Sequence, residues 1–254
     1  MEAAKFRPTS WEPIIVALSQ TQSLSQHARG DRRESARAGL RVLLAIALVL
    51  AAFNPAPSRP KIIVAFGDSL TAGYGLEPRA AFPVVLGRRL REDGYDASVV
   101  NAGVIGDTTQ KGLARLPSVE ALKPDLVILE LGTNDMLNGL DPKLTEANLE
   151  KIIVQLRARG TPLLLVGMRA SPGTLGEAKR QSFDALFPAL AARHSLPFFP
   201  YFLEGVFGDP KRVLWGGIHP NRDGVRSIVD QIAPLVESAL DALAGKPERL
   251  GRAS

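Results

Sequence analysis

The chain has 254 residues, of which 45% are hydrophobic and 22% charged, an ordinary composition for a globular protein. It contains no cysteine, which excludes disulfide bonds, thiolate metal sites, a cysteine nucleophile and a lipid-modified cysteine. The formal net charge is +5, but most of the excess lies in residues 1–56, and the remainder shows no basic stripe interleaved with aromatic residues. We therefore expect no nucleic-acid partner.

Residues 1–37 are polar and lack a sustained hydrophobic period, which predicts a disordered N-terminal extension. Arginines then precede an uncharged apolar run over 42–53, and a proline-rich linker ends at Pro60. This order is typical of a secretory signal, and the run is shorter than the ~20 apolar residues of a membrane span. We interpret 38–60 as a signal peptide or signal anchor with its linker, rather than as a buried N-terminal helix. The protein is then periplasmic or secreted, or stays anchored to the membrane through 42–53 if the signal is uncleaved.

Residues 61–245 alternate strand and helix patterns and form the predicted folded domain, and 246–254 are interpreted as a flexible tail. Apolar runs ending at glycine predict buried strands over 62–66, 126–131 and 163–167, and two more strands are expected over 97–101 and 196–199. Helical patterns cover 81–92, 177–194 and 225–243, and a further helix runs from a predicted N-cap at Thr145 to a stop at Gly160. The alternation predicts a parallel sheet covered on both faces, with a ligand site at the carboxyl ends of its strands.

Polar or glycine-rich segments stand at three of these strand ends and before the last helix. Ser69 follows the first strand and is expected to open a helix, where backbone N–H groups favour negative charge. Gly106 and Asn134 follow the second and third strands, and with the Ser69 N–H they can bind a developing oxyanion. His219 precedes the last helix, and its usual pKa of about 6.5 suits a general base. His194, at a helix end, is expected to be solvated and unrelated to the chemistry.

Each of these residues taken singly has an ordinary structural explanation. Ser69 can cap a helix, and Asn134 and Gly106 can form turns. Their joint arrangement, in chain order around one rim of the sheet, is what favours nucleophilic acyl transfer. The acidic neighbours are interpreted as caps and scaffold groups rather than catalysts: Asp68, Asp107 and Asp135.

The same segments resemble a known family. Residues 65–75 look like the GDSL block, and 103–109, 132–135 and 217–223 are similar to the three later blocks of SGNH (GDSL-type) hydrolases. The resemblance covers about 61–240 and is strongest to a bacterial periplasmic subgroup of multifunctional acyl-CoA thioesterases, lysophospholipases and arylesterases. It implies a flavodoxin-like three-layer α/β/α sandwich around a central, mainly parallel five-stranded sheet, with no metal and no cofactor. It also implies Ser69 as nucleophile, His219 as base, and an oxyanion hole of Ser69, Gly106 and Asn134, with Asp68 in support.

The chain departs from the family pattern at one position. The family usually carries aspartate three residues before the histidine, to orient the imidazole, and Gly216 stands there instead. Three explanations are open. A backbone carbonyl near Gly216 accepts the imidazole N–H, which we favour; a carboxylate such as Glu204 or Asp209 takes the place; or the protein is catalytically impaired.

We therefore expect a serine ester hydrolase that cleaves carboxylic esters or thioesters such as aryl esters, lysophospholipids or acyl-CoA. Its partner is a small-molecule or lipid ester, and we expect a monomer. The alternatives are a carbohydrate O-acetyl esterase and a non-catalytic binding protein on the same scaffold. Position alone assigns five residues to the acyl pocket: Leu76, Ile105, Leu137, Met168 and Arg169.

Overall fold

The structure is a computed structural model and describes residues 59–170, 173, 175–215 and 217–245. Five strands form one sheet: β1 (Lys61–Gly67), β2 (Ala97–Gly103), β3 (Leu126–Glu130), β4 (Leu163–Val166) and β5 (Phe198–Phe199). Their order is β2-β1-β3-β4-β5, and every neighbouring pair is parallel. This is the flavodoxin-like order, in which the connections reverse direction between β1 and β3 and leave a crevice at the carboxyl ends of these strands.

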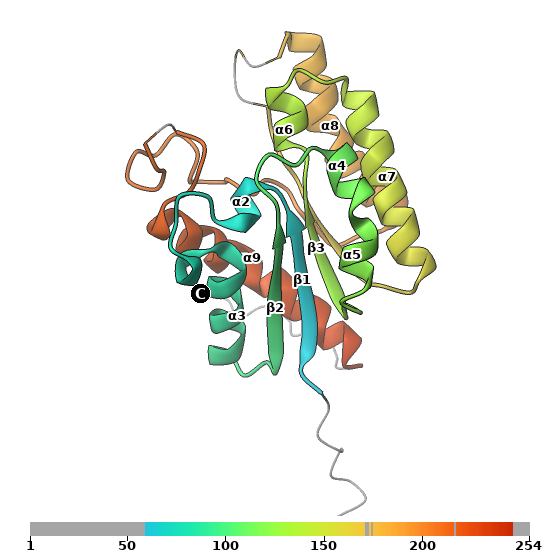
Figure 1. The fold of residues 1–254 in the computed structure, drawn as a ribbon, viewed down its shortest axis with the longest axis vertical. Helices are drawn as coiled ribbons and strands as arrows, with labels where there is room; N and C mark the ends of the chain where they lie inside the picture. The colour runs from blue at the N-terminus through green and yellow to red at the C-terminus, as the bar shows by residue number, and fades with distance from the viewer. Residues whose placement is uncertain (1–58, 171–172, 174, 216, 246–254) are drawn as a thin grey trace, which may run out of the picture. The chain divides into compact units, whose positions relative to one another are not determined.

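Helices cover both faces of the sheet (Figure 1). On one face α3 (Phe82–Glu92) packs against α9 (Arg222–Leu243). On the other, α7 (Pro142–Ala158) packs against both α4 (Thr109–Ala114) and α8 (Glu177–His194). Shorter helical segments lie in the connections: α2 (Ser69–Ala72), η1 (Pro78–Ala80), α5 (Leu116–Glu120) and α6 (Thr133–Leu137). The predicted three-layer α/β/α fold is thus confirmed.

The buried strands explain why the central layer forms. The residues of β3 and β4 are all buried, as are the last five of β1, because both faces of the central strands are covered by helices. The core continues into the helices through their apolar faces; Val225, Ile228 and Ile232 of α9 are almost fully buried. This packing holds the strand ends, and therefore the loops that follow them, in fixed positions.

Two local predictions were wrong. Thr145 does not begin the helix, because Asp141 is the N-cap of α7 and its side chain accepts a hydrogen bond from Lys143 N. An aspartate followed by proline is the better start, since proline suits the first helical position. His194 is not solvated either; its side chain is mostly buried, and its Nε2 atom lies 2.7 Å from Oε1 of Glu150.

Several predictions concern residues outside the described ranges. They are the disordered extension 1–37, all but the last two residues of the signal segment 38–60, and the tail 246–254. Within the described part of the chain, no helix is both long enough and apolar enough to span a membrane.

Candidate active site

Ser69 stands at the carboxyl end of β1, where the strand passes into α2. Asp68 is the N-cap of α2, and its carboxyl group accepts a hydrogen bond from Leu70 N at 2.9 Å. The helix is only four residues long and ends at Gly73, whose left-handed conformation (φ 82°) suits glycine. Ser69 is therefore the first residue of a tight helical turn, and its backbone N–H belongs to the group that has no partner within the helix.

His219 reaches this turn from the far end of the chain. Its Nε2 atom lies 3.0 Å from Oγ of Ser69, within hydrogen-bond distance. The loop that carries it is closed by a bridge between Val213 and Pro220, and Leu214 N donates to the His219 carbonyl at 2.8 Å. Burial lowers the pKa of His219 below its usual 6.5, so the imidazole is neutral near pH 7 and its ring nitrogen can accept a proton.

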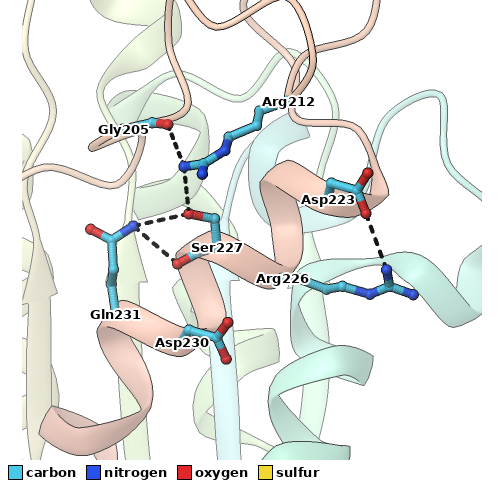
Figure 2. A pocket seen from close by; sticks show the side chains of 7 residues that line it. All are labelled: Gly205, Arg212, Asp223, Arg226, Ser227, Asp230 and Gln231. Atoms are coloured by element: carbon cyan, nitrogen blue, oxygen red, sulfur yellow. Dashed lines mark hydrogen bonds and ion pairs between the residues drawn. The ribbon is translucent and has the colours of Figure 1, made fainter. Parts of the chain in front are cut away.

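The segment before this loop is anchored on α9. Figure 2 shows Arg212 between the two elements: its Nη1 atom donates to the Gly205 carbonyl at 2.8 Å and to Ser227 Oγ at 3.1 Å. The backbone carbonyl of Arg212 also accepts from Asn221 N at 2.9 Å. The residues in Figure 2 line an open polar pocket, which contains neither Ser69 nor His219.

Asn134 lies on α6, directly after β3. The turn passes through Gly132, whose φ of 127° strongly favours glycine. The Asn134 side-chain amide donates to the Asp107 carbonyl at 2.9 Å and to the carboxyl group of Asp68 at 3.3 Å. The amide is thus tied to the Ser69 turn and to the loop after β2, and both of its hydrogens have an acceptor.

Gly106 lies in that loop after β2. Its φ is 76°, and a Cβ atom added there would meet no other atom within 4 Å, so the residue faces open space. The bare backbone leaves room for a ligand to approach its N–H group. Lys111 Nζ donates a hydrogen bond to the Gly106 carbonyl at 3.1 Å.

A pair of buried carboxyl groups lies beneath the Ser69 turn. Glu130, the last residue of β3, is fully buried; its Oε2 atom accepts from Thr71 Oγ1 at 2.7 Å and from Asp68 N at 3.4 Å. Burial raises the pKa of Glu130 well above 4.5 and that of Asp68 to about 7, and the charge of the Asp68 carboxyl raises the pKa of Glu130 further. Burial therefore favours the protonated form of Glu130.

Sequence reasoning missed Glu130 and Thr71. The available signal was the acidic residue that closes an otherwise apolar strand, since a buried carboxyl group at a strand end is rarely accidental. The other two acidic neighbours, Asp107 and Asp135, are bound to groups of the surrounding scaffold. Asp107 pairs with Arg115 at 2.5 Å, and Asp135 accepts from the backbone N–H and the hydroxyl of Thr109.

The residues assigned to the acyl pocket differ in their exposure. Ile105 and Leu137 are exposed, at 61% and 46%, and Leu76 is partly buried against the core. Met168 is buried within the core at 2% exposure, and therefore is not available to line an open rim. Arg169 is exposed; its guanidinium group lies over the Tyr201 ring and 3.3 Å from Glu204.

Neither carboxylate suggested as a substitute for the missing aspartate is paired with His219. Glu204 pairs with Arg169, and Asp209 pairs with Arg212 at 3.4 Å. Gly216 itself lies outside the described residues, so the backbone-carbonyl explanation stays a prediction. Among the residues that the structure describes, no three His, Cys, Asp or Glu side chains are grouped as a metal ion would need.

The chain is similar to several known proteins. Residues 65–226 match the model of the GDSL-like lipase/acylhydrolase family. The chain is 39% identical over 194 residues to thioesterase 1/protease 1/lysophospholipase L1 of Escherichia coli (strain K12), a match that covers 74% of this chain and 90% of that protein. It is 34% identical over 192 residues to an arylesterase of Vibrio mimicus, covering 75% of this chain and 95% of the relative.

Among solved structures, the crystal structure of a protein named TesA matches with a TM-score of 0.67 and 36% identity, over 70% of this chain and 99% of that one. The match therefore covers nearly the whole length of each of these three proteins.

Proposed function

Because the chain belongs to the GDSL-like lipase/acylhydrolase family, we propose that Ser69 and His219 are the catalytic nucleophile and base of its ester hydrolysis. The protein is a serine-type carboxylic ester hydrolase, and the relatives' names support esters and thioesters as substrates. The observation that carries the residue assignment is the 3.0 Å separation between Ser69 Oγ and His219 Nε2. A hydroxyl and a neutral imidazole at this distance form the pair that nucleophilic acyl transfer requires.

The reaction proceeds in two halves. Ser69 Oγ attacks the carbonyl carbon while its proton passes to Nε2 of His219, and the carbonyl oxygen gains the negative charge. The tetrahedral intermediate then collapses, and the leaving alkoxide or thiolate takes the proton from the imidazolium. Water attacks the resulting acyl-Ser69 ester with His219 again as base, and the carboxylic acid is released.

We propose that the oxyanion is held by the Ser69 N–H, the Gly106 N–H and the Asn134 amide. Asn134 already donates to two acceptors, so one of these bonds must give way to the substrate oxygen. The bond to Asp68 is the longer at 3.3 Å, against 2.9 Å to the Asp107 carbonyl, and is the one that we expect to be replaced. The shorter bond then keeps the amide pointing at the oxyanion.

The proposed substrates are aryl esters, lysophospholipids and acyl-CoA thioesters. The exposed side chains of Ile105 and Leu137 support an apolar acyl group, since Ile105 directly precedes Gly106 and Leu137 follows Asn134 by three residues. The relatives' names favour this range over a carbohydrate O-acetyl esterase or a non-catalytic binding protein.

A fluorophosphonate probe tests the assignment, because it reacts with activated serine hydroxyls. We expect labelling at Ser69, its abolition in Ser69→Ala, and a decrease of about 10⁴-fold or more in His219→Ala. Unlabelled wild-type protein that hydrolyses no short aryl ester would support the binding protein. Release of acetate from acetylated sugars in preference to cleavage of aryl esters would support the carbohydrate esterase.

We also propose that residues 38–60 direct export to the periplasm or medium. The support is the order of arginines, the apolar run over 42–53 and the proline-rich linker. Fractionation of bacteria expressing the full chain tests this. Two results would contradict the proposal: esterase activity that stays in the cytoplasm, and export that is unchanged after residues 42–53 are deleted.

A further inference from the structure

We propose that Tyr74 is a positioning residue, whose ring holds the imidazole of His219 in the orientation needed to deprotonate Ser69. This inference rests on the proposed function and adds a residue to it. Tyr74 would perform part of the orienting work that the family resemblance assigns to an aspartate at position 216, where this chain has glycine.

The first argument is that the imidazole has few other partners. Among the described residues it forms one hydrogen bond, to Ser69, and no ion pair with a carboxylate. An imidazole held at one nitrogen can still rotate about its bond to Cβ. A described side chain in contact with the ring would restrict that rotation and help the 3.0 Å contact with Ser69 to persist.

The second argument is the contact itself. The ring centroids of Tyr74 and His219 lie 4.6 Å apart, with an angle of 40° between the planes. This is near the short end of the range for packed aromatic pairs, so the tyrosine ring limits rotation of the imidazole. The face of a phenol ring also attracts a cation, and during acylation His219 becomes an imidazolium.

The third argument is that Tyr74 is fixed to the same turn as the nucleophile. Its backbone N–H donates to the Ser69 carbonyl at 3.0 Å, directly after the Gly73 cap. A Cβ atom added at Gly75 would lie 2.7 Å from Cδ1 of Leu214, so this turn also packs against the segment leading to His219. The tyrosine ring, the hydroxyl and the imidazole therefore keep their relative positions through one short stretch of backbone.

Nearby charged groups do not offer a simpler explanation. Close to Tyr74 and His219 in the chain, Glu77 pairs with Arg79 and Arg222, and Asp223 pairs with Arg226. Tyr74 is 49% exposed, so a direct contact with substrate is the competing role. The two roles differ in which kinetic constant changes.

The test compares Tyr74→Phe, which keeps the ring, with Tyr74→Leu, which keeps apolar cover without an aromatic face. Phe207→Leu, at another exposed aromatic residue, is the matched control. We expect kcat of Tyr74→Phe to stay within about twofold of wild type. Tyr74→Leu should lower kcat roughly tenfold with little change in KM. NMR titration of His219 should also give a lower pKa in Tyr74→Leu, because burial remains while the aromatic face is lost.

A loss confined to KM would assign Tyr74 to substrate binding and overturn the proposal, as would equal kcat values for Phe and Leu. The NMR titration needs no activity, so it separates this inference from the proposed function. If Ser69→Ala still hydrolysed esters, the proposed function would fail whatever the tyrosine variants showed. Circular dichroism and melting temperatures identify any variant that fails to fold.

Discussion

The carboxyl group of Asp68 accepts a hydrogen bond from the side-chain amide of Asn134 at 3.3 Å, so the residue before the proposed nucleophile also holds the proposed oxyanion donor. Burial raises the pKa of Asp68 to about 7, and the carboxyl groups of Asp107 and Asp135 act in the same direction. The strength of the bond to Asn134 therefore changes near neutral pH, because an ionised carboxylate is the better acceptor.

The first prediction concerns this titration. We expect kcat/KM of the wild type to show an inflection near pH 7, as Asp68 ionises and holds the Asn134 amide in the free enzyme, before the substrate oxygen replaces this bond. Asp68→Asn should remove that inflection and lower kcat/KM by about 10- to 10²-fold, because the donor is less well placed when the substrate arrives. Rate profiles between about pH 5 and 9 measure both effects. An unchanged inflection in Asp68→Asn would assign it to another group.

The second prediction concerns His219 as base. Burial lowers its pKa below 6.5, so the neutral, reactive form is present above that pKa and is lost as the pH falls through it. The rate of Ser69 labelling by a fluorophosphonate should therefore fall in acid with a midpoint below 6.5. A midpoint above 6.5 would contradict the prediction and indicate a carboxylate partner, because a nearby negative charge stabilises the imidazolium.

How much of this site can be predicted from the sequence depends on the range of the interactions. Apolar runs such as 62–66 locate the strands, and the βαβ rule places their carboxyl ends on one edge, which is why Ser69 and Asn134 could be predicted to meet. His219, just before the last helix, is the third residue of the predicted site. These inferences need only the period of the pattern and the handedness of the connections.

Other features depend on packing that the pattern does not carry. Glu130 looks like a strand residue, and its role beneath the Ser69 turn follows from its contact with Thr71 on α2, 59 residues earlier in the chain. Met168 looked available because it follows a strand, but the core covers it. Tyr74 stands inside the GDSL block, yet only the closed His219 loop brings the two rings together.

The third prediction tests the packing beneath the nucleophile. A Cβ atom at position 67 would lie 2.1 Å from Thr71 Oγ1 and 2.6 Å from Glu130 Oε2, both buried. Gly67→Ala should therefore destabilise the fold by roughly 1–3 kcal/mol, as overpacking does, and should lower kcat by displacing Ser69. Chemical denaturation and ester hydrolysis measure the two effects.

Gly176→Ala is the control for this substitution, because a Cβ atom there meets nothing within 4 Å. Its stability and activity should stay close to those of the wild type. Equal stability of the two alanine variants would show that the contacts around Gly67 adjust without cost, and would contradict the prediction.

The fourth prediction compares two arginines that line the same pocket (Figure 2). Arg212 ties Gly205 to Ser227 and is part of the segment that leads to His219, whereas Arg226 pairs only with Asp223 among the described residues, and both of those side chains are about 70% exposed. Arg212→Gln should lower the free energy of unfolding by about 1–2 kcal/mol through lost hydrogen bonds, and should lower kcat because the His219 loop loses its anchor. Arg226→Gln should change stability by less than about 0.5 kcal/mol, since exposed ion pairs contribute little.

Denaturation midpoints and kcat for both variants provide the comparison. If Arg226→Gln lowered kcat as much as Arg212→Gln, the effect would come from the charge of the pocket rather than from the anchoring of the loop.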